Sequence, residues 1–248
     1  MKKSLVLLLC LCVLLCGCGS GAAAAKSTDE LFLDAFKKGL TDRWDITLQA
    51  SYNLNDAVNA ELKHVRSFAG QTFEDEHLQK LAYDYIKAVE SQEEALAYET
   101  VDYVKCSTLF GKAYNKRTVL IKQICSEYNI QFADKYKEAY ESIFQSAAAA
   151  EIELGMDEAI ENLIDKATLK LEDGSRTWKS YSVTVKNESK YDIPNLQIQV
   201  QIYDSEHVAV DTCYCDSIKV LRAGESARVS FSTNKDFADY VLYASYYS

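Results

Sequence analysis

The sequence predicts an α+β protein in which a bundle of antiparallel helices precedes a small antiparallel β-sandwich. Two observations lead to this prediction. From residue 27 to residue 166, apolar residues recur at every third or fourth position, which is the spacing of amphipathic helices. From residue 167 to residue 248, apolar and polar residues alternate, which is the spacing of strands with one buried face. We therefore expect two domains that meet near Ala167.

Composition excludes some functional classes. The chain has 248 residues, of which 48% are hydrophobic and 26% charged, so it can bury a substantial core. Its formal net charge is -10. Binding to phosphate backbones needs clustered Lys and Arg, and this balance does not supply them. We expect no nucleic-acid partner.

Residues 1–17 are organised like a signal peptide. Lys2 and Lys3 precede an apolar run from Leu5 to Leu15, which is too short to span a bilayer but has the length of a signal-peptide core. The run ends in Leu-Cys-Gly-Cys at 15–18, which resembles the bacterial lipobox. This resemblance implies cleavage before Cys18 and a diacylglycerol on the Cys18 thiol. The alternatives are a secretory leader cut elsewhere and an uncleaved anchor.

If the lipobox is processed, residues 18–26 form a short tether. The chain would then be exported and held on the outer face of the bacterial cell membrane by the lipid. Removing residues 1–17 takes away two lysines and no acid, so the mature chain is still more acidic. Because anionic headgroups repel an acidic protein, the lipid rather than the protein surface would hold it there.

The expected helices carry apolar stripes that are one face wide, so they must pack on each other. Thr28 and Thr72 are expected N-caps, because acidic residues follow each of them. Gly70, Gly111 and Gly155 lie near expected breaks, with shorter helices over 56–65 and 157–164. The four stripes are Phe32, Phe36, Leu40 and Trp44; Leu78, Leu81, Tyr85, Val89 and Leu96; Leu109, Ala113, Leu120 and Ile124; and Tyr136, Ala139, Ile143 and Ala147.

The expected strands alternate around turn residues at intervals typical of a small sandwich. The segment Val-Gln-Ile-Tyr-Asp at 200–204 resembles the name motif of the FxLYD domain, an immunoglobulin-like module of bacterial surface lipoproteins. The Asn-Glu-Ser turn at 187–189 and the Gly-Glu-Ser corner at 224–226 fit the same domain. The resemblance implies an immunoglobulin-like β-sandwich over 167–248 and a surface location. It carries no known active site.

Four cysteines besides Cys18 remain after the leader. Cys106 and Cys125 are expected near the ends of adjacent helical segments, where a hairpin could join them in a disulfide. Two buried free thiols are the alternative.

Cys213 and Cys215 follow a segment in which the even-numbered residues are apolar. We therefore expect the even-numbered residues of this strand to face the core. Both cysteines then fall on the opposite face, close enough to share a soft metal or a sulfur electrophile. A bulge that reverses the register would instead bury them as small apolar residues.

No catalytic motif is found in the sequence, and no cofactor or metal site is expected. The histidines are isolated, so a neutral-pH base is hard to nominate. Tyr240, Tyr243, Tyr246 and Tyr247 could form a sugar- or peptide-binding face, or pack as a closing strand.

The expected function is therefore that of a non-enzymatic surface lipoprotein that binds or scaffolds a surface protein or another envelope component. The alternative is a solute-binding lipoprotein with its ligand between the helical and strand domains.

Overall fold

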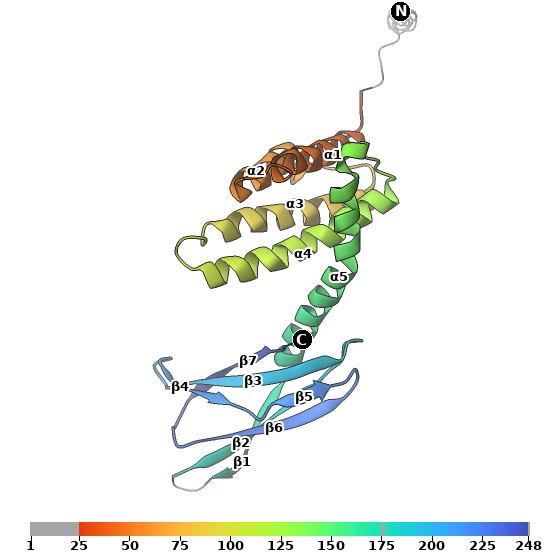
Figure 1. The fold of residues 1–248 in the computed structure, drawn as a ribbon. Helices are drawn as coiled ribbons and strands as arrows, with labels where there is room; N and C mark the ends of the chain where they lie inside the picture. The colour runs from red at the N-terminus through yellow and green to blue at the C-terminus, as the bar shows by residue number, and fades with distance from the viewer. Residues whose placement is uncertain (1–24, 175–176, 248) are drawn as a thin grey trace, which may run out of the picture.

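The computed structural model describes residues 25–174 and 177–247. Within these ranges, the N-terminal part forms five α-helices and the C-terminal part forms two antiparallel sheets (Figure 1). The α+β class predicted from the two hydrophobic periods is therefore confirmed. None of the described helices is long and apolar enough to cross a membrane.

The helical part contains α-helices and two short 3₁₀ turns. In chain order these are α1 (Thr28–Thr47), α2 (Leu54–Val65), η1 (Arg66–Phe68), α3 (Glu76–Leu96), α4 (Tyr103–Glu127), η2 (Asp134–Tyr136) and α5 (Lys137–Asp165). α1 packs on α2, α3 packs on α4, and α4 also packs on α5. Figure 1 shows α5 running from the level of α1 down to the sheets.

The helix starts differ from the expected ones. Ser27 caps α1 and forms a reciprocal capping box with Glu30. Asp75 caps α3 through the N–H groups of His77 and Leu78, so Thr72 lies outside that helix. Thr28 is already the first residue of α1 and Thr72 lies three residues before Asp75, so in both cases the side-chain oxygen just before the helix accepts the free N–H groups.

Two predicted helix breaks do not occur. α4 continues through Gly111 and α5 continues through Gly155. A glycine costs a helix only about 1 kcal/mol relative to alanine, which the packing of a long helix outweighs. The predicted stripes of α1 and α3 are buried throughout, whereas Leu109 of the α4 stripe is 41% exposed.

The strands form a three-stranded and a four-stranded sheet. The first has the order β1-β2-β6, and in the second β3 pairs with β4 and β5 and also with β7. Their bounds are β1 (Thr168–Gly174), β2 (Lys179–Lys186), β3 (Ile193–Tyr203), β4 (Ala209–Tyr214), β5 (Ile218–Leu221), β6 (Ser226–Thr233) and β7 (Asp239–Ser245).

Apolar residues of both sheets belong to one core. Val183 and Phe231 come from the three-stranded sheet, and Ile198 and Val200 come from the four-stranded one. The alternating pattern predicted for β3 is present, since its even-numbered residues from 196 to 202 are buried. We call this group of residues the strand core.

The C-terminal half of α5 also belongs to the strand core. Ala159, Ile160 and Leu163 pack with the strands, whereas Ile143 near the start of α5 packs with the other helices. The change from helix to strand falls between Asp165 and Thr168, close to the predicted position. The boundary between the two cores, however, lies inside α5.

Candidate functional site

Cys18 lies outside the described residues. The four cysteines that the structure describes, Cys106, Cys125, Cys213 and Cys215, are all buried and free.

Cys106 and Cys125 do not form the disulfide considered from the sequence. Both lie on α4, near opposite ends of that helix. At a rise of 1.5 Å per residue, they are about 28 Å apart, whereas a disulfide needs Cα atoms less than about 7 Å apart. The hairpin that would have joined them depended on a break at Gly111. Burial raises the pKa of the Cys125 thiol to about 12, so this thiol is not ionised at neutral pH.

The predicted core face of the segment with Cys213 and Cys215 is wrong. Ile202 pairs with Asp211 but Tyr203 pairs with Ala209, so Val210 forms a bulge. The bulge reverses the faces: Val208 is 56% exposed, while Cys213 and Cys215 are 8% and 5% exposed. Burial raises the pKa of the Cys215 thiol to about 11, with Asp216 and Cys213 adding to the shift. Both thiols are therefore small core residues.

No cluster of three or more potential metal ligands occurs among residues 25–174 and 177–247. The C-terminal tyrosines divide between core and surface. Tyr246 is half-buried against the strand core, where burial and then the charges of Asp157 and Glu153 raise its pKa. Tyr243 and Tyr247 are 47% and 65% exposed. The C-terminal strand therefore both closes the core and presents aromatic rings.

A cleft of about 460 Å³ lies where α5 meets the β2–β3 loop. We call it the junction cleft. One wall carries Asn162 of α5 and Lys166, which directly follows that helix, and the other carries Glu188 and Lys190 of the loop. All four side chains are exposed, so the cleft is open to solvent. Glu188 forms ion pairs with both Lys166 and Lys186, which joins the end of α5 to the loop.

Gly155 and Tyr191, which both line the junction cleft, pack closely against each other. A Cβ atom on Gly155 of α5 would lie only 2.4 Å from the ring of Tyr191, far closer than such atoms approach. The ring therefore lies where a side chain at position 155 would be. Gly155 is needed here for space rather than for backbone freedom, because it lies inside a continuous helix.

The β2–β3 loop is itself held rigidly. Asn187 is 1% exposed, and its Nδ2 donates to the backbone oxygens of Tyr191 and Leu221 at 2.7 and 3.0 Å. Its backbone N–H donates to Glu225 O, and the N–H of Gly224 donates back to Asn187 O at 2.7 Å. Gly224 has φ 80°, a conformation that favours glycine. The two turns singled out in the sequence thus bind each other.

The helical core contains a buried charged network that the sequence reasoning missed. Glu61 of α2 is fully buried, and its Oε2 accepts from Arg43 Nη1 of α1 at 2.9 Å. Its Oε1 accepts from Arg117 Nε of α4 at 2.7 Å and from the hydroxyl of Tyr85 of α3. Arg43 Nη1 also donates to Gln92 Oε1 at 2.8 Å. Every one of the first four α-helices contributes to this network.

Electrostatics explain why the network stays ionised. Burial alone would raise the pKa of Glu61, but the charges of Arg117 and Arg43 outweigh it and lower that pKa. Burial, followed by the charge of Glu61, raises the pKa of Tyr85. The sequence feature that could reveal this network is a charged residue inside an apolar stripe. Arg117, for example, lies between Ala113 and Leu120. Glu61, Tyr85 and Arg117 are at most 2% exposed, so the network lies inside the helical core.

Comparisons with known proteins identify no relative by sequence. No family profile matches the chain, and no curated protein matches it. Among solved structures, the chain is similar to the Pseudomonas fluorescens alkylpurine DNA glycosylase AlkC bound to DNA containing an abasic-site analogue. That similarity has 8% identity and a TM-score of 0.23, over 83% of this chain and 67% of the other.

Proposed function

We propose that this chain is a lipid-anchored, non-enzymatic surface protein that holds its strand part away from the membrane. In this proposal, the strand part binds a surface protein or another envelope component. The observation that carries the proposal is where the chain enters the fold: α1 begins at the end of the molecule opposite the sheets.

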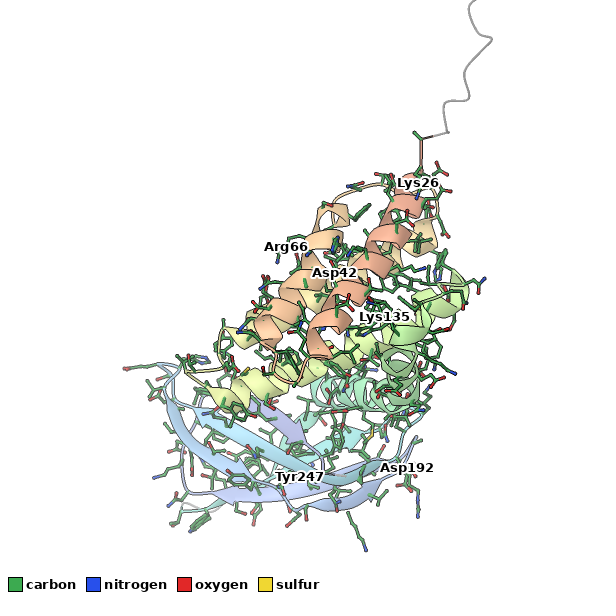
Figure 2. All side chains as sticks on the ribbon, turned by 45° about the horizontal axis from the view of Figure 1, so that its top comes forward. Lys26, Asp42, Arg66, Lys135, Asp192 and Tyr247 are labelled. Atoms are coloured by element: carbon green, nitrogen blue, oxygen red, sulfur yellow. The ribbon has the colours of Figure 1, made fainter. Side chains whose placement is uncertain are left out.

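Both views support this arrangement. Figure 2 has Lys26 at one end of the molecule, with Asp192 and Tyr247 in the strand part on the other side of the helices. α5 connects the two ends, and its 29 residues make it about 43 Å long. A lipid on Cys18, shortly before Thr28, would therefore lie beside the helical part and leave the sheets farthest from the membrane.

The proposal includes an FxLYD-type, immunoglobulin-like fold for residues 167–248. Two antiparallel sheets that share one core are consistent with it. Within the motif, Val200 and Ile202 are buried. Asp204 follows β3, and its Oδ1 accepts from the N–H groups of Glu206 and Val208 at 2.9 Å. The motif therefore supplies two core residues and a carboxylate that fixes the β3–β4 turn.

The anchor is tested by replacing Cys18. Full-length wild type, Cys18→Ser and the matched control Cys16→Ser are expressed in a bacterial host with a palmitate analogue. We expect the wild type and Cys16→Ser to be labelled and to fractionate with membranes. Cys18→Ser should be unlabelled and keep its leader. Labelling or cleavage that persists in Cys18→Ser would refute the anchor.

The orientation is tested separately with an introduced thiol. Because the described native cysteines are buried, a cysteine at exposed Ser205 in the β3–β4 turn is the reactive group. On intact cells, a bulky membrane-impermeant maleimide should label Ser205→Cys faster than Lys26→Cys, which lies near the proposed anchor. Equal or reversed rates would contradict the distal position of the sheets.

The junction cleft favours a second candidate, a solute-binding lipoprotein. Its volume of about 460 Å³ would admit a small molecule. Its exposed walls favour a loosely held, polar ligand. A thermal-shift screen with small carboxylates and amines tests this candidate. A stabilising solute should lose its effect in Asn162→Trp, which narrows the cleft, and keep it in Asn115→Trp on α4.

A further inference from the structure

We propose that the outer face of the four-stranded sheet binds a neutral, β-linked glycan. The face is centred on β3, whose odd-numbered glutamines point away from the strand core. Figure 1 shows this sheet on the side of the strand part that is nearer to α3 and α4. We call it the glutamine face, and its central members are Gln197, Gln199, Gln201, Thr212, Tyr214 and Tyr243. The strand register adds Val241 and Ser245 of β7, and Tyr203 and Asp239 at one end.

The strand register arranges two tyrosines symmetrically about a central amide. Gln199 pairs with Tyr214 of β4 on one side and with Tyr243 of β7 on the other. Strands are about 4.8 Å apart, so the two rings are about 10 Å apart across the sheet. Tyr214 is 63% exposed and Tyr243 is 47% exposed. Two sugar rings of one chain can therefore each stack on a tyrosine.

The glutamines supply the hydrogen bonds that such a ligand needs. Each side chain carries a donor and an acceptor, which suits the hydroxyl and acetamido groups of sugars. Two of the amides are also held in place. Gln197 Nε2 donates to Cys215 O at 2.9 Å, and the hydroxyl of Tyr203 donates to Gln201 Oε1 at 3.0 Å. The face is thus ordered before a ligand binds, which lowers the entropic cost of binding.

Charge selects the ligand class. None of the six central members is charged, although 26% of the chain is charged and its net charge is -10. Asp239, at the end of the face, lies 3.7 Å from His207. An anionic polymer would need Lys or Arg on this face, and a cationic peptide would need carboxylates. A neutral glycan matches both the amides and the rings.

The experiment uses the full-length chain purified in detergent, so it does not depend on lipid at Cys18. It is titrated calorimetrically with chitohexaose and with cellohexaose. We expect saturable binding of at least one of them, weakened about tenfold by Tyr214→Ala or Tyr243→Ala, which corresponds to one stacked ring. Tyr243→Phe keeps the ring and should retain binding. Tyr83→Ala, on α3 and equally accessible at 52% exposure, is the matched control.

Gln199→Ala should also weaken binding. Because this variant removes no packed ring, it still tests the proposal if a tyrosine variant loses its fold. The proposal is overturned if neither oligosaccharide binds, or if Gln199→Ala and the tyrosine variants bind as wild type does. It is also overturned if sedimentation shows that this face mediates self-association that the tyrosine variants abolish.

Discussion

Arg43 Nη1 donates to Glu61 Oε2 at 2.9 Å, and both side chains lie almost wholly out of solvent. The same carboxylate pairs with Arg117, so one buried negative charge is shared by two buried guanidinium groups. The pKa of Arg43 is lowered by burial and by repulsion from Arg117. Burial would also lower the pKa of Arg117, but attraction to Glu61 and Tyr85 outweighs burial and raises it. Arg117 Nε also makes the shorter hydrogen bond to Glu61, at 2.7 Å.

Glu61→Gln should destabilise the helical part strongly. Gln cannot neutralise the two guanidinium groups, and breaking a buried ion pair from one side costs about 3–5 kcal/mol. Urea unfolding followed by circular dichroism measures this loss. Glu93→Gln removes an exposed partner of Arg66 and is the control, with an expected loss below about 1 kcal/mol. Equal losses for the two variants would show that the buried network contributes no more than a surface pair.

Asp42 should make stability depend on pH in the acid range. Burial would raise its pKa, but hydrogen bonds from Lys38 and His64 outweigh burial and lower it from 3.8 to about 2. A carboxyl whose pKa is lowered by folding adds stability above the unfolded value, and that stability is lost as the pH falls from about 4 to about 2. The side chain is 19% exposed, so we expect about 1–2 kcal/mol at neutral pH.

Asp42→Asn tests this dependence. The variant should be less stable than wild type at pH 7, and the difference should shrink as the pH approaches 2. Asp45 also has a lowered pKa, through hydrogen bonds from Lys135 and Tyr136, but is half-exposed and serves as the comparison. A stability difference for Asp42→Asn that stays constant with pH would contradict the assigned cause.

The faces of long, regular elements could be predicted from the sequence, because a single period governs each of them. The apolar stripe from Phe32 to Trp44 in α1 and the even-numbered residues from Leu196 to Ile202 in β3 are buried as their spacing predicts. Features that depend on a partner far along the chain could not be predicted. The bulge at Val210 arises because Ala209, and not Val210, pairs with Tyr203. The buried position of Glu61 is explained only when three other helices surround it.

The candidate sites show the same difference between local patterns, which the sequence predicts, and contacts between distant segments, which it does not. Cys213 and Cys215 were assigned to the wrong face because one extra residue reverses an alternating pattern. The junction cleft and the glutamine face depend on which strands become neighbours. The sequence shows the glutamines of β3 as the polar half of an alternating pattern. It does not show which tyrosines become their neighbours in the sheet.

The thiols should be unreactive in the folded protein. Burial raises the pKa of Cys125 to about 12 and that of Cys215 to about 11, so little thiolate forms at neutral pH. A colorimetric thiol reagent should detect none of the four described cysteines in native mature protein. In denaturant without reductant it should detect all four. Detecting only two would indicate a disulfide and contradict the placement of Cys106 and Cys125 on one helix.

Gly155→Ala should destabilise the protein although alanine favours helices. The added Cβ would lie 2.4 Å from the Tyr191 ring, so either the ring or the end of α5 must move. We expect a loss of about 1–3 kcal/mol, as for other overpacked sites. Gly111→Ala is the matched control, since a Cβ there meets nothing within 4 Å. It should be neutral or stabilise the protein by up to about 1 kcal/mol.

A double variant separates the clash from other effects at the same position. Tyr191→Ala removes the ring, so adding Gly155→Ala to it should cost nothing further or restore some stability. Thermal unfolding of the four variants in this cycle, wild type included, measures the coupling between the two residues. If Gly155→Ala costs the same with and without the ring, Tyr191 is not what requires glycine at this point of α5. A coupling above about 1 kcal/mol would show that the Tyr191 ring excludes a side chain at position 155.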